Sequence, residues 1–317
     1  MAGLTKRTVL VTGGAGFIGS HLVNTLVDRG FSVIVLDIAV DPKSFFSTEK
    51  IYKKITFELA DIRDKLLLHK IIQKYSPDYI FHMAAEPIVE KAFEDPYSAF
   101  ETNIMGTVNL LEAVRENLKV KGVIVTSSDK AYGKTVKAYT EDSPLKGDHP
   151  YDVSKSAQDL IAQTYFKSYG LPIIITRFGN VYGEGDIHLN RIIPGICEAI
   201  IKNKVLEIRS NGKYVRDYLY VKDVVEGCII LLEKFQSNVG EAFNFSSNEN
   251  MSVLQVIKNV EKTLQKKIPY KILNTAKNEI PYQHLNDSKI RKLGWKPNES
   301  LEKTFTGILD WYRLVLK

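Results

Sequence analysis

The sequence has few cysteines and no recognisable set of metal ligands. Only two cysteines occur in 317 residues, and Cys197 and Cys228 do not form a CxxC pair. The six histidines show no HxxxH spacing. Disulfide frameworks and zinc sites need paired cysteines or closely spaced ligands. We therefore expect neither, and no bound metal.

Long apolar runs and clustered charge are also missing. The apolar run at residues 9–11 is too short for a secretory signal, and no stretch approaches the length of a membrane span. The 43 basic and 37 acidic residues leave a net charge of +6, spread along the chain. A nucleic-acid-binding surface would need a clustered basic patch. We expect a cytoplasmic protein without a membrane or nucleic-acid partner.

The first half of the chain alternates β-branched runs with helical patterns. Residues 16–29, 66–74 and 99–117 have helical periodicity. The predicted strands lie at 8–11, 31–36, 55–59, 79–82, 123–126 and 173–176. Alternation of this kind is typical of an α/β fold in which helices cover both faces of a parallel sheet.

The pattern changes after Phe178. Glycine and asparagine interrupt residues 179–190, the segment 214–226 returns to a core-like pattern, and a final helix is predicted at 301–316. We predict that residues 1–178 and 217–246 form the sheet domain. Residues 179–216 and 247–317 are predicted to form a smaller, discontinuous C-terminal lobe that binds the substrate.

A glycine-rich turn joins the first strand to the first helix. Its sequence is TGGAGFIG at residues 12–19, with glycines at 13, 16 and 19 and with Phe17 and Ile18 opening the helix. Such glycines permit a tight turn, let backbone amides approach a pyrophosphate and allow close packing of helix on strand. The turn therefore predicts a doubly wound, Rossmann-type dinucleotide site.

Asp37 ends the second predicted strand and favours NAD over NADP. Its carboxylate can accept hydrogen bonds from ribose hydroxyls and would repel a 2′-phosphate, and no arginine follows in the next three residues. Further cofactor contacts are expected after the third and fourth strands, from Asp61, Ile62, Ala84 and Ala85.

Motifs along nearly the whole chain resemble the extended short-chain dehydrogenase/reductase family. They are TGGAGFIG at 12–19, HMAAE at 82–86, Asn103 in NIMGTVNLLEA, YDVSK at 151–155, RFGNVYG at 177–183, RDY at 216–218 and LGWKP at 293–297. The resemblance implies an NAD-dependent enzyme that acts on a nucleotide-diphosphate sugar. It also implies that Asn103 belongs to the cofactor site and that the protein is a homodimer formed through a four-helix contact.

Tyr151 and Lys155 form the YxxxK motif of this family. The segment around them is predicted to be helical, so residues four apart share a face. An ammonium nearby stabilises a phenolate, and we expect it to lower the pKa of Tyr151 from about 10 towards the working pH. Tyr151 can then accept a proton from a sugar hydroxyl, which Ser128 is expected to hydrogen-bond.

Asp129 and Lys130, directly after Ser128, distinguish two activities within the family. Simple 4-epimerases usually have small or neutral residues there, whereas 4,6-dehydratases place an acid and a partner there. The Asp-Lys pair resembles CDP-glucose 4,6-dehydratases and some N-acetylhexosamine dehydratases, although this chain is shorter than the CDP-glucose enzymes. A structural ion pair at a strand end is the alternative interpretation.

The resemblance implies the following reaction. Oxidation of C4 by Tyr151 and NAD acidifies the C5 proton. Lys130 removes that proton, Asp129 protonates the departing C6 hydroxyl, and hydride returns to C6. The assignment of acid and base within the pair stays open. The rival functions are a 4-epimerase on the same scaffold and a non-catalytic NAD-binding regulator, which would usually lack the tyrosine or the lysine.

Four further residues are expected to contact the substrate. Asn180 and Arg216 match family positions that hold the diphosphate, and an arginine fork suits phosphate because it donates two aligned hydrogen bonds. Arg191 belongs to a segment that usually lines the nucleotide, and Glu86 to a position near the sugar. The sequence names neither the base nor the sugar.

Overall fold

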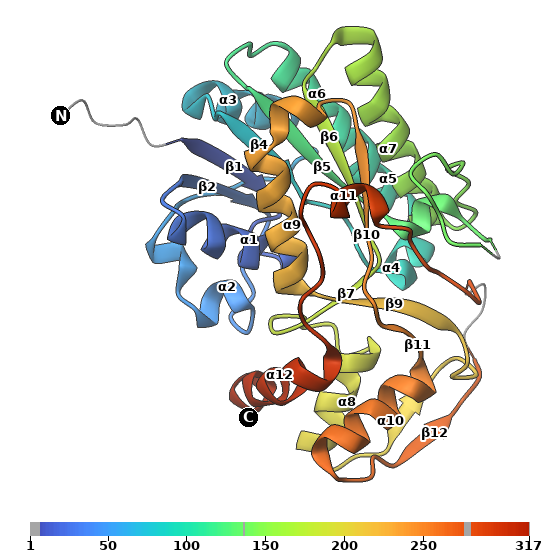
Figure 1. Ribbon diagram of the computed structural model, residues 1–317. Helices are drawn as coiled ribbons and strands as arrows, with labels where there is room; N and C mark the ends of the chain where they lie inside the picture. The colour runs from blue at the N-terminus through green and yellow to red at the C-terminus, as the bar shows by residue number, and fades with distance from the viewer. Residues whose placement is uncertain (1–6, 136, 276–279, 317) are drawn as a thin grey trace.

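A seven-stranded parallel sheet forms the upper part of the molecule (Figure 1). The computed structural model describes residues 7–135, 137–275 and 280–316. The strand order is β10-β6-β5-β4-β1-β2-β3. The strands are β1 (Thr8–Thr12), β2 (Ser32–Asp37), β3 (Thr56–Leu59), β4 (Tyr79–His82), β5 (Gly122–Ser128), β6 (Ile173–Phe178) and β10 (Ala242–Phe245). The predicted α/β, doubly wound fold is confirmed.

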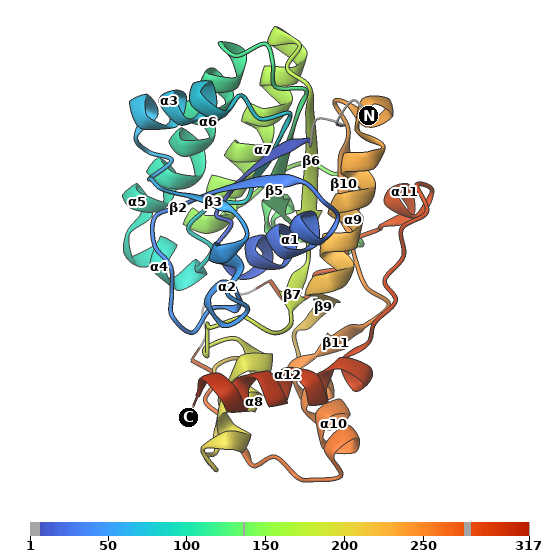
Figure 2. The ribbon, with the colours of Figure 1, turned by 90° about the vertical axis from the view of Figure 1, so that its left-hand side faces the viewer.

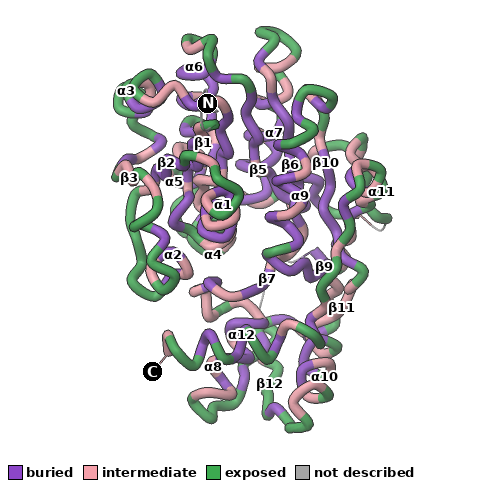
Figure 3. The backbone as a smooth tube through the Cα atoms, turned by 60° about the vertical axis from the view of Figure 1, so that its left-hand side comes forward, coloured by how far each residue is buried: buried purple, intermediate pink, exposed green. Residues whose placement is uncertain are grey.

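Helices cover both faces of this sheet, as Figure 2 shows. On one face lie α3 (Lys65–Tyr75), α5 (Pro96–Phe100), α6 (Gly106–Arg115) and α7 (Pro150–Tyr169). On the other lie α1 (Phe17–Asp28), α2 (Phe45–Thr48) and α9 (Val221–Glu233). The strands supply mostly β-branched, leucine and aromatic side chains to two cores, one on each face, because a parallel sheet between helices is buried on both faces. Figure 3 shows the central strands as almost entirely buried.

The predicted helix at 99–117 is confirmed as far as residue 115, but it is not a regular α-helix throughout. The chain instead forms α5, a π-helical turn at Glu101–Met105 and then α6. Asn103 lies in the π-helical turn and is fully buried. Its amide donates to Ser154 Oγ (2.8 Å) on α7 and accepts from the backbone N–H of Glu86 (2.7 Å). These hydrogen bonds hold Asn103 in a helical turn that is wider than an α-helical turn. The spacing of apolar residues in the sequence does not reveal a single widened turn.

The lower part of the molecule is built around small sheets and three helices (Figure 1). One sheet has the order β11-β9-β7 and the other pairs β12 with β8. Helices α8, α10 and α12 enclose a separate apolar core that includes Phe305 and Tyr312. The bounds are β7 (Asn180–Tyr182), α8 (Ile192–Ile201), β8 (Leu206–Ile208), β9 (Val215–Tyr220), β11 (Asn250–Ser252), α10 (Val253–Leu264), β12 (Tyr270–Ile272) and α12 (Leu301–Val315).

Short elements complete the chain. They are a 3₁₀ turn at Ile51–Lys53, α4 (Val89–Glu94), a 3₁₀ turn at Asp129–Tyr132, a 3₁₀ turn at Phe235–Asn238 and α11 (Ser288–Arg291). Strand β10 joins the large sheet beside β6, and α9 packs on α1. The domain boundaries after residues 178, 216 and 246 stay a prediction. No helix among the described residues is both long and apolar enough to cross a membrane.

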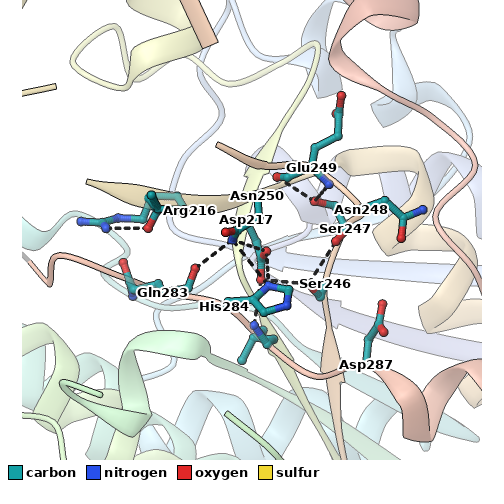
Figure 4. A network of polar contacts seen from close by, with 12 residues as sticks. Arg216, Asp217, Ser246, Ser247, Asn248, Glu249, Asn250, Gln283, His284 and Asp287 are labelled. Carbon is teal, nitrogen blue, oxygen red and sulfur yellow. Dashed lines mark hydrogen bonds and ion pairs between the residues drawn. The ribbon is translucent and has the colours of Figure 1, made fainter. Parts of the chain in front are cut away.

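Asp217 on β9 holds the junction between the two parts (Figure 4). Its carboxylate is 1% exposed. It accepts hydrogen bonds from Ser246 Oγ (2.9 Å), Asn250 Nδ2 (3.0 Å), His284 Nδ1 (2.8 Å) and the Leu285 N–H (2.9 Å). A buried carboxylate is costly unless such donors compensate its lost hydration. Asp217 therefore fixes the segment around His284 against the sheet that carries Arg216.

We predict that replacing His284 by asparagine weakens folding more in acid than in alkali. The hydrogen bond that His284 donates to the Asp217 carboxylate raises the pKa of His284. A raised folded-state pKa gives stability that is fully present below the unfolded value of about 6.5 and is lost as the pH rises through the folded value. His284→Asn should therefore cost about 1 kcal/mol more near pH 5.5 than near pH 9. Denaturant unfolding of both proteins at both pH values measures this, and an equal cost would contradict it.

Candidate active site

Two predicted site residues, Asp37 and Ser128, and two of their neighbours, Thr12 and His82, lie at the carboxyl ends of strands in the large sheet. Thr12 ends β1, Asp37 ends β2, His82 ends β4 and Ser128 ends β5. The strand order reverses between β1 and β4. Open α/β sheets bind ligands in the crevice at such a reversal, because the connections leave to opposite faces there.

The glycine-rich turn leaves room only for backbone. Gly13 has φ +68°, and a Cβ on it would lie 2.7 Å from the backbone nitrogen of Ala84. A Cβ on Gly19 would lie 2.1 Å from the Gly13 carbonyl oxygen. Gly16 caps α1 without a side-chain hydrogen bond, so the first N–H groups of the helix have no side-chain partner there. Close backbone and an uncapped helix N-terminus fit a pyrophosphate.

The acidic residues beside the turn differ in their surroundings. Asp37 accepts hydrogen bonds from the N–H groups of Ala15 (2.9 Å) and Ile38 (2.8 Å), and burial raises its pKa. Its carboxylate is thus fixed next to the turn with acceptor capacity left for ribose hydroxyls. Asp61 instead pairs with Arg63 at 2.6 Å, and the Ile62 side chain packs beneath Gly106. The residues around the turn therefore fit NAD. Asp37 is better placed than Asp61 to accept hydrogen bonds from the ribose hydroxyls, because Asp61 is paired with Arg63.

A chain of buried polar side chains links this turn to Lys155. Thr12 Oγ1 contacts His82 Nδ1 (2.8 Å), and His82 Nε2 contacts Thr107 Oγ1 (2.9 Å). Thr107 also accepts from Gln158 Nε2 (2.9 Å), whose Oε1 accepts from Lys155 Nζ (2.6 Å). Burial lowers the pKa of His82 to about 3. The ring is therefore neutral near pH 7, and the chain positions Lys155 without adding charge.

Tyr151 and Lys155 lie on α7 with both side chains buried. Lys155 Nζ donates to the Thr126 carbonyl (2.8 Å) as well as to Gln158, and burial lowers its pKa to about 8. The expected lowering of the Tyr151 pKa is wrong for the protein without cofactor. Burial raises that pKa to about 12, and a hydrogen bond with Ser128 opposes the rise only in part. Loss of hydration outweighs the ammonium, which is directed to two other acceptors.

Ser128, Asp129 and Lys130 are interlocked in the 3₁₀ turn after β5. Ser128 Oγ donates to Asp129 Oδ1 (3.0 Å) and accepts from the Lys130 N–H (3.2 Å). Asp129 is buried, which raises its pKa, while Lys130 is half-buried. Gln283 contacts both side chains, since it donates to Asp129 Oδ2 (3.0 Å) and accepts from Lys130 Nζ (3.3 Å).

A buried ion pair between Arg177 and Asp159 supports the turn that contains Asp129 and Lys130. Arg177 on β6 forms a bidentate contact with Asp159 on α7, at 2.8 and 2.9 Å. The same guanidinium donates to the Tyr132 hydroxyl (2.6 Å) and lies over the Tyr132 ring. Tyr132 ends the 3₁₀ turn and also donates to Asn244 on β10 (2.7 Å). The turn after β5 is therefore held by two strands, β6 and β10, and by helix α7.

Three of the four predicted substrate residues, Asn180, Arg191 and Arg216, lie in the lower part of the molecule. Asn180 Nδ2 is buried and has no hydrogen-bond partner among the described residues, as expected for a group that a ligand would satisfy. The positive charge of Arg216 opposes the rise in the pKa of Asp129 that burial causes. The charge of Arg191 opposes the rise in the pKa of Tyr151 in the same way. Arg191 also pairs with Asp186 at 3.1 Å. Glu86 accepts from the Ile88 N–H (3.0 Å), within the loop after β4.

The sequence analysis missed several residues that lie next to the site. His82 lies inside the quoted HMAAE motif, and Asp152 inside YDVSK, where burial raises its pKa to about 6. Gln158 lies three positions beyond Lys155, the spacing of one helical turn. Gln283 lies 154 positions from Asp129 and has no local motif, so only the folded chain brings it to the pair.

Comparison with known proteins places the chain among sugar-nucleotide enzymes. A model of the GDP-mannose 4,6 dehydratase family matches residues 10–307. The chain is 30% identical to dTDP-glucose 4,6-dehydratase of Haemophilus influenzae, over 96% of this chain and 97% of that protein. It is 31% identical to human dTDP-D-glucose 4,6-dehydratase, over 98% and 91%. These relatives support the dehydratase likeness but not the narrower likeness to CDP-glucose enzymes.

Solved structures of both dehydratases and epimerases share the fold. The dTDP-glucose 4,6-dehydratase of Streptomyces venezuelae, crystallised with NAD, is 29% identical and superposes with a TM-score of 0.86, covering 97% of each chain. The UDP-glucose 4-epimerase of Thermotoga maritima, crystallised with UDP-glucose, is 30% identical with a TM-score of 0.89, covering 98% of this chain and 100% of that one. From the family model and these relatives together, the chain belongs to the GDP-mannose 4,6 dehydratase family.

Proposed function

We propose that this protein is an NAD-dependent nucleotide-sugar 4,6-dehydratase that forms a 4-keto-6-deoxy sugar nucleotide. One observation carries the proposal beyond the family: a buried acid, Asp129, and an amine, Lys130, adjoin Ser128 and Tyr151 and are held by one amide. An epimerase needs no second acid–base pair, whereas removal of water from C5 and C6 does.

Tyr151, Ser128 and Lys155 handle the proton of the C4 hydroxyl. NAD, when bound between the glycine-rich turn and Asp37, supplies a reversible hydride acceptor beside C4. Tyr151 accepts the hydroxyl proton as C4 becomes a carbonyl, and Ser128 orients the reacting oxygen. Lys155, with its pKa lowered to about 8, stabilises the phenolate by charge.

Asp129 and Lys130 carry out the elimination. The C4 carbonyl acidifies the proton on C5, and Lys130 in its neutral form removes it. The C5–H electron pair forms the C5=C6 bond, the C6–O bond breaks, and Asp129 protonates the leaving oxygen to give water. The proton of Asp129 leaves in this water, and Lys130 keeps the proton from C5. Lys130 returns that proton to C5 when C6 takes up the hydride that bound NADH would supply. Asp129 then regains a proton from Tyr151 or from solvent, so that the pair starts the next turnover as a carboxyl and an amine.

The substrate is a nucleotide-diphosphate sugar. Asn180, with its unsatisfied buried amide, and Arg216 are placed to bind the diphosphate, and Arg191 and Glu86 to contact the nucleotide and the sugar. The named relatives act on dTDP-glucose or UDP-glucose, and the matching family is described by GDP-mannose. These three and CDP-glucose form the panel of substrates to compare.

A 4-epimerase is the second candidate. The observation that favours it is the superposition with UDP-glucose 4-epimerase, which is at least as close as that with the dehydratases. The overall fold serves both activities, so the residues of the site must discriminate. The third candidate, a non-catalytic regulator, is disfavoured because Tyr151 and Lys155 are both present.

We predict that the purified protein removes one water from a nucleotide sugar. Incubation with GDP-mannose, dTDP-glucose, UDP-glucose or CDP-glucose, followed by mass spectrometry, should give a product lighter by one water. NADH should not accumulate, because the cofactor ends in its original state. A product of unchanged mass that proves to be the C4 epimer would contradict the dehydratase.

We predict that Tyr151→Phe lowers turnover on the order of 10²- to 10⁴-fold, the usual contribution of a general acid–base group. NAD binding should persist, because the lost group is a single hydroxyl. Tyr169→Phe, at the exposed end of the same helix, serves as the matched control and should keep full activity. Unchanged turnover in Tyr151→Phe would overturn the assigned mechanism.

We also propose that the protein works as a cytoplasmic homodimer. Large apolar side chains are exposed on the helices of one sheet face: Tyr97 on α5, Met105 in the π-helical turn, and Val153 and Leu160 on α7. Val153 and Leu160 are seven residues apart and therefore share a face. Contiguous exposed apolar side chains mark association surfaces.

Both cysteines are buried and free, which suits a reducing compartment such as the cytoplasm.

We predict that Leu160→Glu converts the dimer to a monomer. A buried, unpaired charge at an apolar contact costs several kcal/mol, enough to lower association by orders of magnitude. Sedimentation velocity of the wild type and the variant tests this. Leu314→Glu, on the exposed side of α12, should remain dimeric. A monomeric wild type, or a dimeric Leu160→Glu, would refute the proposed contact.

A further inference from the structure

Gln283 is fully buried and faces the acid–base pair from a distant part of the chain. Its Nε2 donates to Asp129 Oδ2 at 3.0 Å, and its Oε1 accepts from Lys130 Nζ at 3.3 Å. One amide therefore contacts both members of the pair.

The backbone of Gln283 is itself tightly held (Figure 4). Its N–H donates to the Val215 carbonyl (3.1 Å), and its carbonyl accepts from Asn250 Nδ2 (3.4 Å). The next two residues, His284 and Leu285, both donate to the buried Asp217 carboxylate. Because these bonds fix the main chain, the remaining freedom of Gln283 lies in its side chain.

The amide group can match either proton distribution of the pair. As observed, its NH₂ end faces Asp129 and its oxygen faces Lys130, which complements a carboxylate and an ammonium. Rotation of the amide by half a turn would present the oxygen to a protonated carboxyl and the NH₂ to a neutral amine. An ionised aspartate or glutamate in its place would offer no donor, and a lysine ammonium would offer no acceptor.

We propose that Gln283 is a positioning residue that holds Asp129 and Lys130 in place while Asp129 loses its proton and Lys130 gains one from C5. The inference rests on the proposed roles of Asp129 and Lys130. Before elimination the pair is a carboxyl and an amine, and afterwards a carboxylate and an ammonium. Gln283 satisfies the hydrogen bonds of both states, so neither group has to leave its position when charge appears in the buried site.

The first test uses Gln283→Met, which keeps the length of the side chain and removes the amide. Each of the four nucleotide sugars above is mixed with the NAD-loaded protein. Water loss should slow about 10- to 100-fold, the worth of hydrogen bonds to charged groups. The C4 oxidation step, followed as a transient of NADH, and KM should stay within about twofold. Gln73→Met, exposed on α3, is the matched control and should behave as wild type.

The pH profile of Gln283→Glu separates positioning from mere packing. At high pH the new carboxylate repels Asp129 and donates nothing to it, so water loss should be slow. Protonation of the new carboxyl restores a donor towards Asp129, so activity should recover as the pH falls. A purely structural role would give Gln283→Met and Gln283→Glu parallel pH profiles, and that result would overturn the proposal.

A second measurement needs no sugar substrate. Acetic anhydride acetylates accessible amines in their unprotonated form, and a hydrogen bond that holds the amine slows the reaction. Peptide mass spectrometry reports each lysine separately. In NAD-loaded Gln283→Met, Lys130 should be labelled several-fold faster than in the wild type, relative to the exposed Lys43. Equal labelling together with wild-type water loss would overturn the inference.

The variants Asp129→Asn and Lys130→Met distinguish failure of the inference from failure of the proposed function. Water loss that persists in both of them refutes the assigned roles of the pair. Loss of activity in both, with Gln283→Met unaffected in rate and in labelling, refutes the role of Gln283 alone. If none of the four sugars loses water, the labelling of Lys130 decides the inference.

Discussion

The buried carboxylate of Asp217 is the constraint on which the two-part architecture depends. It accepts four hydrogen bonds from three segments, including the one that contains His284 and Leu285. Without those donors the charge could not remain buried, and without the charge the donors would lose their common acceptor. The same anchoring sets Arg216 on one side and Gln283 on the other, so the substrate-facing residues of the lower part keep a fixed position over the end of the large sheet.

Burial also governs the proton chemistry of the site. It lowers the pKa of Lys155 to about 8 and raises that of Tyr151 to about 12, so burial separates two groups whose pKa values are nearly equal in water. It keeps His82 neutral within the chain of hydrogen bonds that reaches Lys155. A site built in this way responds strongly to any charge that enters it, because few water molecules screen that charge. The cofactor and the diphosphate are therefore part of its electrostatics.

Solved structures of a dehydratase and of an epimerase superpose on this fold with similar TM-scores, 0.86 and 0.89. We propose that the distinction lies in the turn after β5, where Asp129 and Lys130 follow Ser128. That turn is supported from behind by Arg177 and Tyr132 and covered by Gln283. An extra acid–base pair next to an existing redox site extends hydroxyl oxidation to elimination, since the first step creates the acidic proton that the second removes. The scaffold can thus remain constant while the chemistry changes.

The sequence by itself determined the sheet, the cofactor turn and the motif residues, because each is written in local periodicity or in residues a few positions apart. Glycine spacing at 13, 16 and 19 and the helical pair Tyr151 and Lys155 are of this kind. The tertiary structure decided the widened helix at Asn103, the raised pKa of Tyr151 and the arrival of Gln283 at Asp129. Burial and contacts across 154 positions arise only when the chain is folded, since desolvation and long-range hydrogen bonds have no counterpart in local sequence.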